Sequence, residues 1–166
     1  MDLFWDELTL GIGDPRQVMR VVIRLLAATI LGAIVGFERE KAGKPAGLRT
    51  NTLVCLGTAV FIIVCSEVGM SHDALSRVIQ GIVTGIGFIG AGSILKLEGE
   101  RDIRGLTTAA GVWMTAAIGV CVGLGSIGIA AMGTLLAVII LAVVGAIEAR
   151  AEGDRTEVVK HSKFQH

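Results

Sequence analysis

One uncharged stretch, residues 105–147, most constrains what this chain can fold into, because it contains no Asp, Glu, Lys or Arg. A continuous helix over this stretch would be roughly 65 Å long, about twice the ~30 Å thickness of a bilayer's hydrocarbon core. The stretch therefore predicts two membrane-spanning helices. Gly123 and Gly125, in the sequence Gly-Leu-Gly-Ser, mark the turn between them.

Three shorter uncharged runs predict three further spans. The chain is 52% hydrophobic and only 18% charged, against about 25% charged in a typical soluble domain. Lipid leaves no partner for the edges of an open sheet, so the spans must be helical. We expect an all-α polytopic membrane protein, a glycine-rich bundle of five transmembrane helices within 15–148, at approximately 18–38, 48–68, 77–96, 105–122 and 127–148.

The distribution of Lys and Arg predicts the orientation. Most of them flank the spans on one side: Arg39, Lys41, Lys44, Arg49, Lys96, Arg101, Arg104, Arg150, Arg155, Lys160 and Lys163. The positive-inside rule places this side in the cytoplasm, with the N-terminus outside and the C-terminus inside. Residues 1–14 are acidic and lack the basic region of a signal peptide. We expect a periplasmic, interfacial segment there, a helix start at Asp14-Pro15, and a disordered cytoplasmic tail at 149–166.

The first two spans resemble the next two at an offset of 58 residues. Gly47, Leu48 and Thr50 match Gly105, Leu106 and Thr108, and each set follows a basic loop and opens a span. The pattern indicates a parallel two-helix internal repeat, of the kind that occurs in transporters and in other membrane proteins.

Glycines recur at small-xxx-small spacing within the spans. Residues 85–90 also match G-x-G-x-x-G, but that dinucleotide fingerprint needs a strand before it, which an apolar span does not provide. Glycine instead lets membrane helices approach closely. We expect packing at Gly32, Gly36, Gly81, Gly85, Gly87, Gly90, Gly92, Gly119 and Gly123, either within the chain alone or with one glycine face left for a homodimer.

Polar residues gather at the cytoplasmic ends of the spans. They form either a functional cluster, in which Glu38 pairs with an arginine, or a set of basic side chains that snorkel to the headgroups. The residues are Glu38, Arg39, Arg49, Thr50, Asn51, Arg104, Thr107 and Thr108. Arg24 is the one ionisable residue well inside a span. It is either functional or snorkels to the outer headgroups. Gln80 and Thr84 are expected to hydrogen-bond across helices.

Several kinds of site are not expected. No carboxylate lies well inside the expected spans, since Glu38, Glu67 and Glu148 are at their ends, although Mg²⁺ is usually bound by one or two carboxylates and waters. No cofactor is expected, and Mg²⁺ binding has no support from intramembrane ligands. The histidines lie outside the spans, and Ser66, His72 and Asp73 imitate a triad only by proximity. We therefore expect no enzyme activity. The balanced charge argues against a nucleic-acid partner.

Four segments resemble the bacterial MgtC/SapB family. They are Gly-Phe-Glu-Arg-Glu at 36–40, Gly-Lys-Pro-Ala-Gly-Leu-Arg-Thr-Asn-Thr-Leu-Val at 43–54, Gly-Ile-Gly-Phe-Ile-Gly-Ala-Gly at 85–92 and Arg-Gly-Leu-Thr-Thr-Ala-Ala at 104–110. The resemblance covers roughly 18–147. It implies an inner-membrane protein linked to magnesium homeostasis. The positions that the resemblance marks are Arg24, Glu38, Arg39, Gly47, Leu48, Arg49, Thr50, Gly85, Gly87, Gly90, Gly92, Arg104, Gly105, Thr107 and Thr108. The short tail and the residues Thr107 and Met114 resemble the SapB-type branch, which lacks a soluble C-terminal domain.

The resemblance and the residues together leave three functions open. The first is a non-enzymatic regulator or accessory factor, acting on another membrane protein complex such as the ATP synthase. The alternative is a transporter or channel for Mg²⁺ or another small solute, favoured by the repeat and the glycine-rich third span. The third is a structural protein whose basic loops bind anionic headgroups. The expected partners are the lipid bilayer, a second copy and such a complex.

Overall fold

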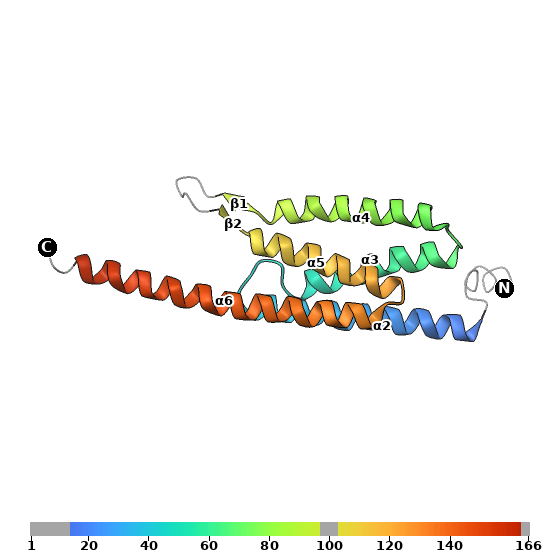
Figure 1. Ribbon diagram of the computed structural model, residues 1–166, viewed down its shortest axis with the longest axis horizontal. Helices are drawn as coiled ribbons and strands as arrows, with labels where there is room; N and C mark the ends of the chain where they lie inside the picture. The colour runs from blue at the N-terminus through green and yellow to red at the C-terminus, as the bar shows by residue number, and fades with distance from the viewer. Residues whose placement is uncertain (1–13, 97–102, 164–166) are drawn as a thin grey trace, which may run out of the picture.

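The computed structural model describes residues 14–96 and 103–163, with side chains at 14–94 and 104–145. Five of its helices are long and apolar enough to cross a membrane, which confirms the all-α polytopic class (Figure 1). The elements are α2 (Pro15–Lys41), α3 (Leu48–Glu67), α4 (His72–Gly92), β1 (Leu95–Lys96), β2 (Ile103–Arg104), α5 (Leu106–Gly123) and α6 (Ile127–Lys163). Residues 1–13, where an interfacial segment was expected, lie outside the described part of the chain.

Polar caps set the starts of α2 and α4. The Asp14 carboxylate accepts a hydrogen bond from the Arg16 backbone N–H at 3.0 Å, and Pro15 occupies the first turn of α2. This start confirms the expectation for Asp14-Pro15. Ser71 caps α4 by accepting from the Ala74 N–H at 3.3 Å. The third span therefore begins at His72 instead of 77, because a capped first turn forms in polar residues that hydropathy does not detect.

The third span also ends earlier than expected, at Gly92 instead of 96. Beyond it, β1 pairs antiparallel with β2, with Leu95 opposite Arg104 and Lys96 opposite Ile103. This two-residue ladder lies between α4 and α5. It leaves the helical class unchanged.

The turn between α5 and α6 lies where the glycines predicted it. α5 ends at Gly123, α6 begins at Ile127, and Gly125 has φ +87°. That left-handed conformation favours glycine because other residues would strain their Cβ. α6 then continues to Lys163, which corrects the expected disordered tail as far as that residue. Extending an existing helix is much easier than nucleating one, and 149–163 contains no proline.

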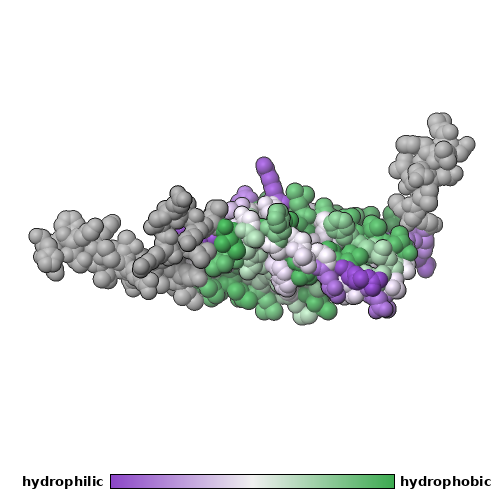
Figure 2. Space-filling model, turned by 90° about the horizontal axis from the view of Figure 1, so that it is seen from above, coloured by the Kyte–Doolittle hydropathy of each residue, from purple (hydrophilic) through white to green (hydrophobic). Residues whose placement is uncertain are grey.

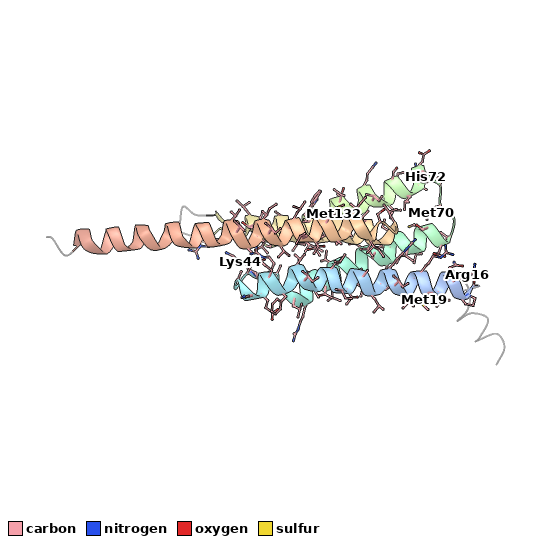
Figure 3. All side chains as sticks on the ribbon, turned by 60° about the horizontal axis from the view of Figure 1, so that its bottom comes forward. Arg16, Met19, Lys44, Met70, His72 and Met132 are labelled. Carbon is pink, nitrogen blue, oxygen red and sulfur yellow. The ribbon has the colours of Figure 1, made fainter. Side chains whose placement is uncertain are left out.

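Three helices form the centre of the bundle. Buried side chains of α2, α3 and α5 meet there, among them Ala28, Val35, Cys55, Ala59 and Val122. α5 is the most deeply buried span and α4 the least. In Figure 3, Arg16, Met70 and His72 lie at one end of the bundle and Lys44 at the other, as alternating spans require.

Glycines close the contacts of α3 with α2 and with α5. A Cβ added to Gly32 or Gly36 of α2 would lie 2.7 Å from an atom of α3, and one on Gly119 or Gly123 of α5 would lie 2.5 or 2.6 Å from α3. Gly90 makes an ordinary contact, its added Cβ lying 3.5 Å from Ala109 of α5. The predicted packing role therefore holds within the chain for these glycines. The other four predicted positions, all on α4, face open space: Gly81, Gly85, Gly87 and Gly92.

The starts of α3 and α5 agree with the proposed repeat. Gly47 and Gly105 are the N-cap residues, and Leu48 and Leu106 are the first helical residues. The two caps differ in conformation, since Gly47 has φ −88° and Gly105 has φ +97°. The β1–β2 ladder precedes only the second cap. The repeat stays a prediction at the level of whole helix pairs.

Candidate functional site

A buried ion pair lies near the end of α2. Arg39 is 2% exposed, and its Nε donates to Glu38 Oε2 at 2.9 Å. Its side chain lies against α5, since a Cβ added to Gly111 would be 3.8 Å from Arg39 Cδ. Among the described side chains, Arg39 Nη1 is the one fully buried polar atom without a hydrogen-bond partner.

The burial of the Arg39 guanidinium is energetically costly. Removing a guanidinium from water costs several kcal/mol, and one carboxylate offsets that cost only when the geometry and remaining hydrogen bonds are good. A buried donor without a partner costs about 1–3 kcal/mol more. Stability alone therefore does not explain Arg39. We infer that the pair is the strongest candidate for a functional group in the described chain.

Beside it, an amide network joins α3 to α5. Asn51 is fully buried, and its Nδ2 donates to the carbonyls of Ala46 at 2.8 Å and Gly47 at 3.0 Å. Its Oδ1 accepts from Thr115 Oγ1 at 2.8 Å. Sequence reasoning missed Thr115, because a lone hydroxyl in an apolar run looks like a residue that bonds its own helix. Thr115 does have that option, since Gly111 O lies 2.9 Å away.

A second missed residue is Glu40, which holds the loop between α2 and α3. Its Oε2 accepts from the Leu48 N–H at 2.9 Å, at the start of α3. A carboxylate is favourable there because the first N–H groups of a helix have no partner within it. Gly47 leaves room for the contact, since an added Cβ would lie 2.9 Å from Glu40 Oε2. Glu40 lies in α2 but caps the next helix, α3. No local sequence pattern predicts a contact across the intervening loop.

The other predicted cluster members are divided by burial. Thr108 is buried and Thr50 half-buried, whereas Arg49, Arg104 and Thr107 are exposed. The expected ion pair of Glu38 is confirmed with Arg39, its neighbour in sequence. Arg49, Thr50, Thr107 and Thr108 belong to the first turns of α3 and α5. The buried part of the site is therefore Arg39, Asn51, Thr108 and Thr115, with Glu38 partly buried beside Arg39.

Arg24 lies toward the other end of the bundle and caps α5. Its Nη1 donates to the Gly123 carbonyl at 3.0 Å. The guanidinium fills the space beside Gly125, where an added Cβ would lie 2.7 Å from Nη2. A cation at a helix C-terminus interacts favourably with the last carbonyls. Arg24 thus ties α2 to the α5–α6 turn.

Replacing Arg24 should weaken this tie measurably. We expect Arg24→Met to lower the free energy of unfolding by about 1–2 kcal/mol, because a charged hydrogen bond and a helix-end interaction are lost. Titration of the purified protein in mixed detergent and SDS, followed by circular dichroism, measures the change. Arg20→Met is the matched control, since Arg20 is exposed one turn earlier. An equal loss in both variants would contradict the capping role.

The polar pair of α4 departs from expectation. Thr84 Oγ1 donates to the Gln80 backbone carbonyl at 2.9 Å, within its own helix, and both side chains are exposed. This geometry corrects the expected hydrogen bond across helices, as far as the helices of this chain are concerned. A threonine within a helix commonly bonds the carbonyl one turn back.

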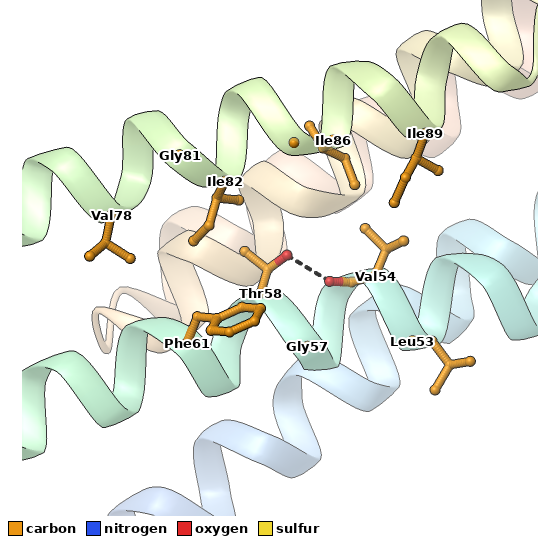
Figure 4. A pocket seen from close by; sticks show the side chains of 11 residues that line it. Leu53, Val54, Gly57, Thr58, Phe61, Val78, Gly81, Ile82, Ile86 and Ile89 are labelled. Carbon is orange, nitrogen blue, oxygen red and sulfur yellow. Dashed lines mark hydrogen bonds between the residues drawn. The ribbon is translucent and has the colours of Figure 1, made fainter.

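An apolar groove of about 630 Å³ lies between α3 and α4. Apolar side chains and glycines line most of it, including Phe61, Ile82 and Gly81 (Figure 4). Its one hydroxyl, on Thr58, donates to Val54 O at 2.7 Å. The described residues hold no group of three or more His, Cys, Asp or Glu that could bind a metal ion. The groove therefore suits an acyl chain or an apolar side chain better than a cation.

Comparison with known proteins places the chain among related membrane proteins. The model of the MgtC family matches residues 25–150. Protein SrpB of Synechococcus elongatus is 43% identical over 129 residues, covering 71% of each chain. "Putative magnesium transporter YhiD" of Escherichia coli K12 is 42% identical over 129 residues, covering 74% of this chain and 59% of YhiD.

A third relative, Protein MgtC of Salmonella typhimurium, is 51% identical over 104 residues, covering 63% of this chain and 43% of the relative. The matched part thus spans less than two thirds of both YhiD and the Salmonella protein. No solved structure matches the chain.

Proposed function

This chain belongs to the MgtC family, and from that membership we propose that it is a non-enzymatic regulator or accessory factor of magnesium homeostasis in the bacterial inner membrane. The name of its relative YhiD supports the link to magnesium. In the proposed orientation the ends of α2 and α6 and the starts of α3 and α5 face the cytoplasm. The distribution of Lys and Arg supports that orientation.

The observation that carries this proposal is the closed centre of the bundle. Glycines bring α2 and α5 onto α3 so closely that an added Cβ would lie 2.5–2.7 Å from the neighbouring helix. The buried amide of Asn51 bonds to Thr115 and to backbone carbonyls. Mg²⁺ keeps several waters and takes carboxylate or other oxygen ligands, whereas at these glycines α3 lies in direct contact with both neighbouring helices. The packing supports action through the outer surface of the protein.

The cytoplasmic end of the bundle suits contact with a partner complex. The exposed Arg49 lies in the first turn of α3, next to the α2–α3 loop. The hydrogen bond between Glu40 and the Leu48 N–H fixes this loop. The buried Glu38–Arg39 pair lies at the end of α2, just before this loop. A held loop loses little conformational entropy on binding, so it favours recognition. We place the partner contact at the 42–47 loop and the first turn of α3.

Complementation at limiting Mg²⁺ tests the proposal. A deletion strain should grow again when it carries the natural chain or Arg16→Gln. We expect Arg49→Gln to restore little or none of that growth, because it removes an exposed charge at the proposed contact. Both residues are exposed, Arg16 in the first turn of α2 and Arg49 in the first turn of α3, so membrane abundance and thermal stability should match the natural chain. Full complementation by Arg49→Gln would contradict the proposed contact.

Reconstitution separates regulation from transport. Proteoliposomes that hold the purified chain and a Mg²⁺-sensitive dye should take up Mg²⁺ no faster than protein-free liposomes. Saturable uptake that Arg24→Ala or Glu38→Ala abolishes would instead establish transport and overturn the regulator proposal. Circular dichroism of both variants in the same liposomes checks that lost uptake is not lost fold.

A further inference from the structure

α4 carries a stripe of polar and small residues along its outer side. The residues recur at alternating steps of four and three, which keeps them on one helix face. All of them are exposed: Asp73, Arg77, Gln80, Thr84, Gly87 and Ala91. The opposite face packs toward α3 and α5 through Leu75, Ile82 and the buried Ile86. α4 is therefore polar or small along this stripe, and the exposed apolar side chains of Val83 and Phe88 lie beside it.

The outer faces of α2 and α6 have the opposite character. Large apolar side chains are exposed there, as a surface in contact with lipid requires. On α2 they include Ile23, Leu26, Ile30 and Phe37, and on α6 they include Ile129, Leu135, Ile139 and Ile140. Figure 2 looks onto the side where α4 lies in Figure 1. Pale and purple residues run along this side between green apolar regions.

Lipid hydrocarbon is an unfavourable environment for this stripe. Gln80 lies near the middle of α4, and none of the described side chains makes a hydrogen bond to its amide. An amide that faces hydrocarbon without a partner costs several kcal/mol. Gly87 has nothing within 4 Å of an added Cβ, so the backbone there is open to close approach. The stripe thus combines the Gln80 amide, which lacks a hydrogen-bond partner among the described side chains, with small residues that allow close approach. Both features favour packing against another helix.

We propose that α4 packs in parallel along α4 of a second copy, in a twofold-symmetric dimer whose axis is normal to the membrane. All copies share one orientation in the membrane, so such an axis brings identical residues to the same level. A glutamine amide both donates and accepts, so it can satisfy its own copy across the axis. The 3–4 spacing of the stripe matches a left-handed crossing of about +20°.

Charge complementarity supports a second copy as the occupant. Asp73 and Arg77 lie one turn apart near the polar end of the stripe, so the Asp73 carboxylate can reach the partner's Arg77. Phe88, which is 84% exposed beside the stripe, would gain cover from the partner helix. The dimer uses the side of α4 that faces away from α3 and α5, so the inference does not depend on the proposed regulatory contact.

Dimer affinity in liposomes tests the inference. Two populations of the full chain, labelled with donor and acceptor dyes, report the dissociation constant by energy transfer. We expect Gln80→Leu to raise it roughly three- to twentyfold, as interhelical hydrogen bonds in membranes suggest. Gly87→Ile should raise it roughly tenfold or more, because it overfills a close contact. Gly145→Ile is the matched control, since Gly145 is also exposed with open space around it.

Cysteine crosslinking in native membranes places the contact. Gln80→Cys should give a disulfide-linked dimer on mild oxidation, whereas Ile140→Cys on the outer face of α6 and the unsubstituted chain should not. A monomer at all concentrations, an equal effect of Gly145→Ile, or a Gln80→Cys crosslink only to a different protein would each overturn the proposed dimer. Circular dichroism of Gly87→Ile should match the natural chain, because its site touches nothing within the protomer.

Discussion

Glu38→Gln is expected to lower the free energy of unfolding by about 3–5 kcal/mol, the cost typical of removing one partner from a buried ion pair. The substitution keeps the shape of the side chain and an oxygen that can accept from Arg39 Nε. It removes the charge that compensates a guanidinium whose side chain is 3% exposed. Arg39 already has one buried donor without a partner, so the loss adds to a cost that the guanidinium bears in the natural chain.

Titration with SDS, followed by circular dichroism, measures this loss. Glu67→Gln is the matched control, because Glu67 is exposed and accepts a hydrogen bond from Gln17. It should change stability by no more than about 0.5 kcal/mol. The double variant Glu38→Gln/Arg39→Met should recover much of the loss, since it also removes the uncompensated charge. A neutral Glu38→Gln would show that solvent screens the pair despite its burial.

Gly119→Ala should destabilise the bundle by at least about 1–3 kcal/mol, the usual cost of overfilling a packed core. The added Cβ would lie 2.5 Å from the Cys55 carbonyl oxygen and 2.9 Å from Thr58 Cβ. Both neighbours belong to α3, which Gly32 and Gly36 of α2 also contact closely, Gly32 at the same residue Cys55. α3 therefore cannot move away from the new methyl group without breaking a second close contact.

Gly145→Ala is the control for Gly119→Ala and should have the opposite sign. Gly145 lies within α6 with nothing within 4 Å of an added Cβ. Alanine there should stabilise the helix by about 0.5–1 kcal/mol, because it has less backbone entropy to lose. Thermal unfolding in one detergent compares the two variants directly. If both changed stability in the same direction, helix propensity and not close packing would govern these glycines.

Hydropathy and helix-end chemistry, both local, determined the spans and several of their limits. Uncharged runs predicted five helices, Asp14 and Pro15 predicted the start of α2, and Gly123 and Gly125 predicted the α5–α6 turn. These features depend on neighbours in sequence, so they can be read without a fold. The start of α4 was misplaced because the capped turn at Ser71 is polar. The tail was misjudged because α6 continues beyond its apolar part.

Glycine spacing in the sequence could not show which helix each glycine faces. Gly119 and Gly85 belong to the same kind of spacing, yet one touches α3 and the other faces open space. The difference arises from the rotation of each helix about its axis, which depends on how all the helices pack together. The same rotation turns Gln80 and Thr84 outward.

The sequence by itself determined a five-span helical membrane protein, its family resemblance and the pairing of Glu38 with an arginine. Only the tertiary structure decided that Thr115 satisfies Asn51, that Glu40 caps α3 and that Arg24 caps α5. Each of these contacts joins residues that are distant along the chain or separated by a loop. Their partners are set by the approach of whole helices, which the order of residues along one helix does not record.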